Sequence, residues 1–130
     1  MIKKTVIWFE KHYLISLLIA ILIAIFIFYM SSLRFEKGAP GPQIPFKSII
    51  YHFLIFFILA FFLCIYFVKG KCKNKYLIFI ALLIAIAYGI TDELHQLFVP
   101  NRYCDINDAL IDSLGIMLAS IIYMARIRKE

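Results

Sequence analysis

The sequence has 130 residues, of which 64% are hydrophobic and 17% are charged, and its formal net charge at pH 7 is +6. A soluble domain of this size leaves much of its surface in water, so this composition excludes an ordinary soluble domain and indicates a membrane protein. The positive charge does not predict a nucleic-acid partner, because the Lys and Arg residues lie between apolar runs instead of gathering on one face. We expect a single domain over residues 1–130.

Four apolar segments are long enough to form membrane-spanning helices. A helix rises about 1.5 Å per residue, so about 20 residues cross a hydrocarbon core about 30 Å thick. We predict an all-α bundle of four transmembrane helices at residues 13–30, 48–68, 76–98 and 105–125. The first segment is longer than the apolar part of a typical signal peptide and lacks a small-x-small cleavage site after it, so we predict that it also spans the membrane.

The basic residues predict the orientation of these helices. Ten of them lie before the first span, between the second and third spans, or after the fourth span: Lys3, Lys4, Lys11, Lys69, Lys71, Lys73, Lys75, Arg126, Arg128 and Lys129. The other side holds Arg34, Lys37, Lys47 and Arg102. Because cytoplasmic loops carry an excess of Lys and Arg, we predict a multi-pass protein of the cell membrane with both termini in the cytoplasm.

The connection between the first two spans, from Ser31 to Lys47, is rich in residues that disfavour helix: Gly38, Pro40, Gly41, Pro42 and Pro45. Two interpretations stay open for it. It is either a solvated connector or a lid that folds over the bundle.

The three cysteines do not indicate a disulfide framework, because their number is odd and the predicted topology places Cys72 and Cys104 on opposite sides of the membrane. Cys104 follows the polar residues of the third span closely. It is either a reactive thiol or a small hydrophobic residue.

The end of the third span carries a group of polar residues: Asp92, Glu93, His95 and Gln96. A carboxylate at the middle of a bilayer costs about 2.5 to 3.5 kcal/mol on insertion scales, so we expect these groups to face the bundle interior or a water-filled cavity. Asp92, His95 and Gln96 have the i, i+3, i+4 spacing of one helix face, with Glu93 about 100° around the helix from Asp92.

The fourth span carries a matching polar stripe. Asp105, Asp108 and Asp112 stand at i, i+3 and i+7, and Gly115 and Ala119 continue the same stripe. The third and fourth spans are predicted to be antiparallel, which brings the aspartates to the level of the third span's carboxylates. The small residues predict a close approach between helices.

Two basic side chains are predicted to lie near these carboxylates. Arg102 is in the short link between the third and fourth spans, where Asn101 favours a tight turn. Arg102 either pairs with a carboxylate or holds a phosphate or carboxylate of a ligand. His52, at the start of the second span, either joins the polar group or is a hydrogen-bonded structural residue near a helix end.

The residues from Asp92 to Arg102, followed by Asp108 and Gly115, resemble the signature of the VanZ-like membrane proteins, D-E-x-x-Q-x-F-x-P-G-R followed by D, N and G. Weaker similarities involve Ser31-Ser32, Lys47 and His52-Phe53. Asn101 replaces the usual glycine, and Asp112 replaces the usual asparagine, which adds a negative charge or a shared proton. The resemblance implies a small helical membrane protein of a family whose founding member is associated with resistance to the glycopeptide antibiotic teicoplanin.

Our leading hypothesis is a protein that binds or modifies an anionic lipid or a lipid-linked cell-envelope component at the outer membrane face. The predicted catalytic residues, acting as acid and base partners or around a divalent cation such as Mg²⁺, are Asp92, Glu93, His95 and Asp108. The predicted substrate-binding residues are His52, Gln96, Arg102, Asp105 and Asp112. Asp92 with His95 fits a cation only loosely, zinc is not assigned, and the pattern does not decide whether the protein is an enzyme.

Two alternatives belong to other classes. A proton-coupled or ion-coupled transporter would use intramembrane carboxylates, but it predicts acidic groups in the inner halves of the spans and, with four spans, an oligomer. A structural or regulatory partner in an envelope assembly would use the polar group for packing alone. It predicts that neutral substitutions there lower stability.

Overall fold

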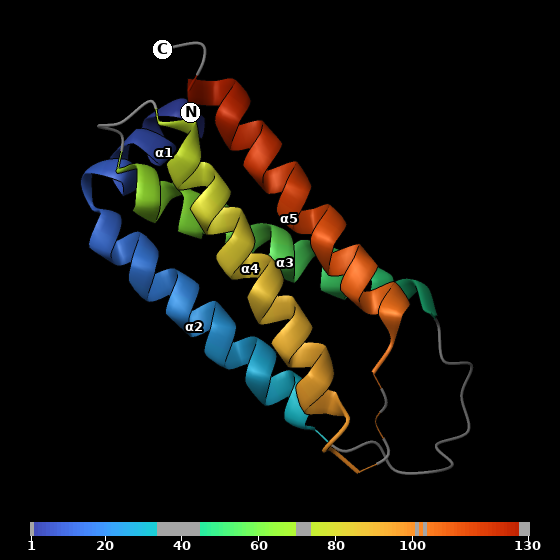
Figure 1. The fold of residues 1–130 in the computed structure, drawn as a ribbon. Coiled ribbons are helices and arrows are strands. Elements are labelled where there is room, and N and C mark those ends of the chain that lie inside the picture. The colour runs from blue at the N-terminus through green and yellow to red at the C-terminus, as the bar shows by residue number, and fades with distance from the viewer. Residues whose placement is uncertain (1, 34–44, 70–73, 101, 103, 128–130) are drawn as a thin grey trace.

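The computed structural model describes residues 2–33, 45–69, 74–100, 102 and 104–127, and in these ranges the chain forms helices and no strand. The helices are α1 (Ile2–Lys11), α2 (Tyr13–Ser32), α3 (Pro45–Val68), α4 (Lys75–Gln96) and α5 (Ile106–Ile127). Figure 1 shows α2 to α5 as long helices that run back and forth along one bundle. The all-α prediction is therefore confirmed.

The four predicted spans are confirmed as helices long and apolar enough to cross a membrane: Tyr13–Ser32, Ser48–Val68, Lys75–Gln96 and Ile106–Ile127. The predicted end of the third span is too late, because α4 ends at Gln96 and the chain turns through Leu97 and Phe98. The predicted start of the fourth span is one residue early, since Asp105 precedes α5. Four such helices indicate a multi-pass membrane protein.

Helix α3 lies at the centre of the bundle and packs against α2, α4 and α5. Its contact with α5 depends on Gly115, where an added Cβ atom would lie 2.4 Å from the backbone oxygen of Phe53 on α3. A glycine therefore lets the two backbones touch, as small residues do between membrane helices. Ala119 is also fully buried, so the predicted small stripe does face the interior.

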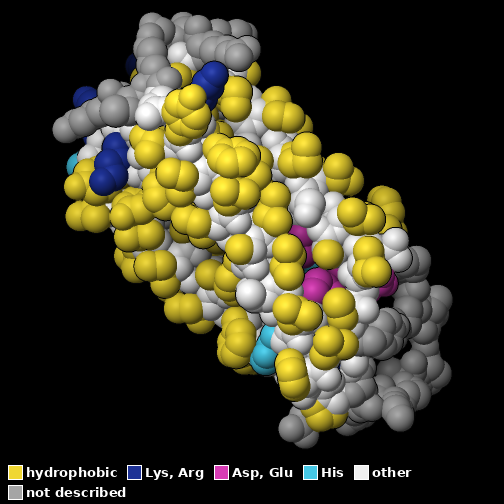
Figure 2. All heavy atoms as spheres, in the orientation of Figure 1, with side chains coloured by type: hydrophobic (Ala, Val, Ile, Leu, Met, Phe, Trp, Pro, Cys, Tyr) yellow, Lys and Arg dark blue, Asp and Glu magenta, His cyan; other side chains and the backbone are white. Residues whose placement is uncertain are grey.

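Large apolar side chains cover the outside of the bundle. Leu18 on α2, Leu83 on α4 and Leu114 on α5 are about half exposed. Figure 2 shows that such side chains cover most of the face formed by α4 and α5. An apolar surface of this extent is unfavourable in water and favourable in lipid.

The first helix, α1, is a finding that the sequence analysis did not predict. It lies beside the end of α5 (Figure 1), and its Val6 and Phe9 pack on the bundle core. Glu10 is buried, accepts a hydrogen bond from the Tyr123 hydroxyl at 2.7 Å and forms an ion pair with Arg126. We call Glu10, Tyr123 and Arg126 the Glu10 cluster. It fastens α1 to the last turns of α5.

Several predicted features lie outside the described residues. They include the turn residue Asn101, Cys72 and most of the connection between α2 and α3, so the choice between a connector and a lid stays a prediction. Cys64 and Cys104 are free thiols, and Cys64 is buried.

Candidate functional site

His52, near the start of α3, is the centre of a polar group at the end of the bundle opposite α1. Its side chain is buried, with Nδ1 3.0 Å from Asp112 Oδ1 and Nε2 3.5 Å from Asp108 Oδ2. The two aspartates are four residues apart, so they share the face of α5 that Gly115 brings against α3. Each ring nitrogen of His52 therefore faces a carboxylate.

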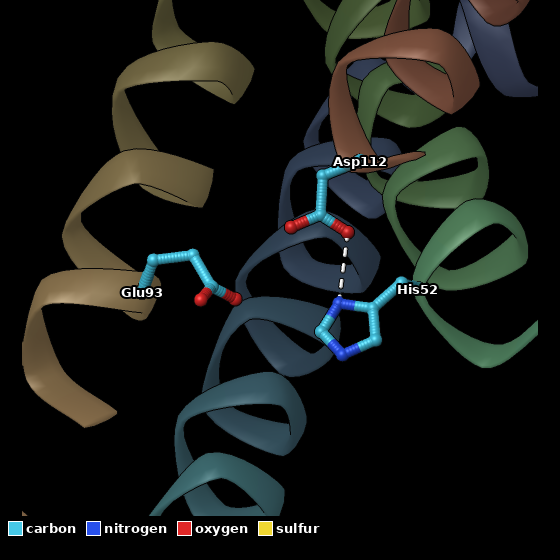
Figure 3. A group of neighbouring side chains, drawn as sticks. All are labelled: His52, Glu93 and Asp112. Atoms are coloured by element: carbon cyan, nitrogen blue, oxygen red, sulfur yellow. Dashed lines mark hydrogen bonds and ion pairs between the residues drawn. The ribbon is translucent and has the colours of Figure 1, made fainter. Parts of the chain in front are cut away.

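Glu93 reaches toward His52 and Asp112 from α4 (Figure 3), and each of these three residues offers one ligand-type atom to a group within 4.8 Å. Glu93 Oε2 accepts a hydrogen bond from the backbone N–H of Asp105 at 3.0 Å, and Oε1 accepts one from Gln96 at 3.3 Å. Three helices therefore meet through polar side chains. We call the following residues the His52 cluster: His52, Asp92, Glu93, Asp108 and Asp112.

Gln96 connects the carboxylates of α4 to the following turn. Its amide nitrogen donates to Asp92 Oδ2 and Glu93 Oε1, both at 3.3 Å, and its amide oxygen accepts from Arg102 Nη1 at 3.4 Å. Asp92, Glu93 and Gln96 are all buried. The amide group thus links the guanidinium to both carboxylates.

Arg102, the half-buried cation beside the cluster, also holds the end of α2. Its Nη2 donates to the backbone oxygen of Met30 at 2.8 Å, and its Nε donates to that of Leu33 at 3.3 Å. These are carbonyl groups at a helix C-terminus, where a cation is favourable. Burial lowers the pKa of Arg102, while the charge of Asp92 raises it. An arginine keeps its charge under such conditions.

His95 faces α2: its Nε2 lies 3.0 Å from Ser32 Oγ, and its ring lies 4.6 Å from that of Phe28. Glu93, on the other side of Asp92, faces α3 and α5. The predicted catalytic role of His95 stays a prediction.

Asp105 touches the cluster through its backbone, whose N–H donates to Glu93. Its side chain turns toward the start of α5, where Oδ1 accepts from the backbone and the side chain of Asn107 at 2.8 and 2.9 Å. This contact is typical of a residue that caps the N-terminus of a helix.

Two neighbours of the site were not predicted as functional residues. Ser32 contacts His95, and Tyr51 is near enough for the charges of Asp92 and Arg102 to act on its hydroxyl. The Tyr51 oxygen is buried and has no hydrogen-bond partner within the described part of the chain. The sequence feature that could have identified Tyr51 as a site residue is its position next to His52.

The His52 cluster has carboxylate oxygens that are available to bind a ligand. Asp92 Oδ1 and Asp112 Oδ2 are buried and lack a hydrogen-bond partner among the residues that the structure describes. A buried carboxylate oxygen is unfavourable unless a donor or a cation faces it. The cluster can therefore accept a proton, a cation or a hydroxyl or amino group of a ligand.

The cluster opens toward the side of the bundle. Figure 2 shows acidic side chains between α4 and α5 in a face that is otherwise largely apolar. Asp108 has the accessible carboxylate, since 24% of its side chain is exposed whereas 1% of the Asp112 side chain is. The acidic groups thus reach the surface on a side of the bundle that is otherwise largely apolar.

One known protein family matches nearly all of the helices of this bundle. The VanZ/LLP1 family matches residues 16–128, which include almost all of α2 and the whole of α3, α4 and α5. No curated protein and no solved structure matches the chain. The resemblance found in the sequence is confirmed by this match: the chain belongs to the VanZ/LLP1 family.

Proposed function

We propose that the protein binds an anionic lipid, or a lipid-linked component of the cell envelope, through Arg102 and the His52 cluster. The observation that carries this proposal is the lateral opening of a charged site within an apolar, membrane-spanning face (Figure 2). A ligand that enters between α4 and α5 needs an apolar tail to remain in lipid and a polar head to reach the carboxylates.

The two kinds of charge in the site have separate tasks in this proposal. The planar guanidinium of Arg102 recognises a phosphate or carboxylate, and its contacts with the end of α2 hold it in position. Asp108 is exposed enough to accept hydrogen bonds from hydroxyl or amino groups of the same head group. Asp92 and Glu93 contact the head group from the α4 side.

The proposed orientation places this site toward the outer face of the cell membrane. Helix α1 and the end of α5 lie together at the opposite end of the bundle, and the Lys and Arg side chains visible in Figure 2 lie near that end. The positive-inside rule favours the cytoplasm for that end, with both termini there. A cell-envelope ligand also agrees with the association of the family's founding member with teicoplanin resistance.

Native mass spectrometry of the gently solubilised protein tests the proposal. We expect the wild type to retain a defined anionic lipid and Arg102→Ala to lose most of it, a change of about tenfold or more for a charge-assisted contact. Arg102→Lys should retain an intermediate amount because it keeps the charge and loses the fork. Lys11→Ala is the matched control, since it removes an exposed cation at the other end of the bundle.

Circular dichroism and thermal unfolding must first show that the variants are folded. A wild-type protein that carries no lipid under any gentle condition would contradict the proposal. Equal lipid retention by folded Arg102→Ala and the wild type would contradict it as well.

A further inference from the structure

We infer that His52, Glu93 and Asp112 form a binding site for one divalent transition-metal ion. They come from α3, α4 and α5 and offer one imidazole nitrogen and two carboxylate groups (Figure 3). This mixed set suits Zn²⁺ or Mn²⁺ better than Mg²⁺, which prefers oxygen ligands. The histidine is His52 and not His95, which the sequence pattern had placed near the carboxylates.

The separation of the three side chains fits a single ion. Their ligand atoms lie within 4.8 Å of one another, and the side chains of His52, Glu93 and Asp112 are all buried. Ligand atoms about 2.1 Å from a tetrahedral ion lie about 3.4 Å apart, so side-chain movements of about 1 Å close the group around an ion.

A second observation points to a cation at this place. Asp112 Oδ1 faces His52, whereas Oδ2 points toward Glu93 in Figure 3 and has no hydrogen-bond partner in the described ranges. The Asp112 side chain is only 1% exposed, so water does not readily compensate this oxygen. A divalent cation between the two carboxylates gives Oδ2 a partner and neutralises both charges.

The surroundings of each ligand are those of a supported metal site. A metal-binding histidine usually donates its other ring N–H to a carboxylate, which fixes the tautomer and the ring. His52 Nε2 faces Asp108 Oδ2 at 3.5 Å, so a proton on Nε2 leaves the Nδ1 lone pair directed at the ion. Glu93 is likewise held by hydrogen bonds from the Asp105 backbone and the Gln96 amide.

Metal content can be measured without added lipid, so this inference and the proposed lipid site can fail separately. Detergent-solubilised protein is stripped with a chelator, dialysed against Zn²⁺, Mn²⁺ or Mg²⁺ in turn, and analysed by inductively coupled plasma mass spectrometry. We expect about one Zn²⁺ or Mn²⁺ per chain and an affinity for Mg²⁺ that is about tenfold weaker or more.

Substitutions identify the ligands. His52→Gln and Asp112→Asn should each weaken metal binding by about tenfold or more, and Asp108→Asn by about tenfold, since it supports the ring without binding the ion. His95→Gln is the matched control: it also removes an imidazole near the end of α4, but on the α2 side. It should keep the wild-type metal content.

X-ray absorption of the Zn²⁺-loaded protein adds a test that does not depend on variants. Nitrogen and oxygen atoms as the nearest neighbours of Zn²⁺ support the site. Sulfur neighbours would assign the ion to a cysteine and overturn the inference. The inference is also overturned if the folded wild type binds none of the three ions. Unchanged metal content in folded His52→Gln and Asp112→Asn, or equal loss in His95→Gln, would overturn it too.

Discussion

The two polar clusters at opposite ends of the bundle differ in how their charges are balanced. In the Glu10 cluster one carboxylate meets one guanidinium: Glu10 Oε1 accepts from Tyr123 and Arg126, and Oε2 accepts from Arg126 at 3.2 Å. In the His52 cluster three carboxylates lie near one imidazole, Asp92 is linked to them through Gln96, and two buried carboxylate oxygens lack a described partner. In the first arrangement both carboxylate oxygens have donors, whereas the second leaves two carboxylate oxygens for a ligand.

The buried positions of α5 between the two clusters carry no ionisable side chain. Ile116 and Ala119 have no exposed surface, and the Ser120 hydroxyl donates to the Ile116 backbone within its own helix. A transporter would be expected to place ionisable groups along this stretch. The comparison therefore favours a binding site at one end and a structural fastening at the other.

The largest loss of stability is expected at the Glu10 cluster. Glu10→Ala leaves Arg126 and the Tyr123 hydroxyl without their acceptor, which should lower the free energy of unfolding by about 2 to 4 kcal/mol. Tyr123→Phe removes one donor and leaves the ion pair, so it should cost about 1 kcal/mol. Unfolding in detergent measures both. A negligible effect of Glu10→Ala would show that α1 is not fastened by this contact.

Gly115→Ala should have the next largest effect. The added Cβ meets the Phe53 backbone oxygen at 2.4 Å, and because that atom belongs to a helix backbone, α3 and α5 must separate. Overpacking of this kind costs about 1 to 3 kcal/mol. The separation also moves His52 away from Asp112, so retention of metal and lipid should fall as well.

Leu114→Ala is the control for this variant, because the neighbouring Leu114 is 59% exposed on the lipid-facing side. Its unfolding free energy should change by about 0.5 kcal/mol or less, as is usual for surface positions. If Gly115→Ala were as mild as Leu114→Ala, α3 and α5 would not be in the close contact described.

Much of the fold could be predicted because apolar runs of about 20 residues have few other stable solutions in lipid. The polar residues of α4 and α5 could be assigned to one level because consecutive spans alternate in direction. The partner of His52 could not be predicted, since Asp112 is 60 residues away in sequence. Only the approach of α5 to α3 at Gly115 selects it.

Two other features depend on how the helices pack. With about 100° per residue, Gln96 lies between Asp92 and Glu93 on the helix, and His95 lies about 60° beyond Asp92. The helical spacing alone allows either Glu93 or His95 to lie beside Asp92 and Gln96 on the face toward α3 and α5. Because His95 contacts α2, Glu93 is the residue on that face. Glu10 was missed because its partners are 113 and 116 residues away.

Asp112→Asn should have a small effect on stability and thus separates the two clusters most sharply. The asparagine oxygen can still accept from His52, and a neutral group replaces a buried charge, so the free energy of unfolding should change by about 1 kcal/mol or less. The same variant should lose the metal ion. Unfolding curves recorded beside those of Glu10→Ala make the comparison direct. If Asp112→Asn destabilised the protein as strongly as Glu10→Ala, the charge of Asp112 would be needed for folding and not for binding. The His52 cluster would then have a structural role, like the Glu10 cluster.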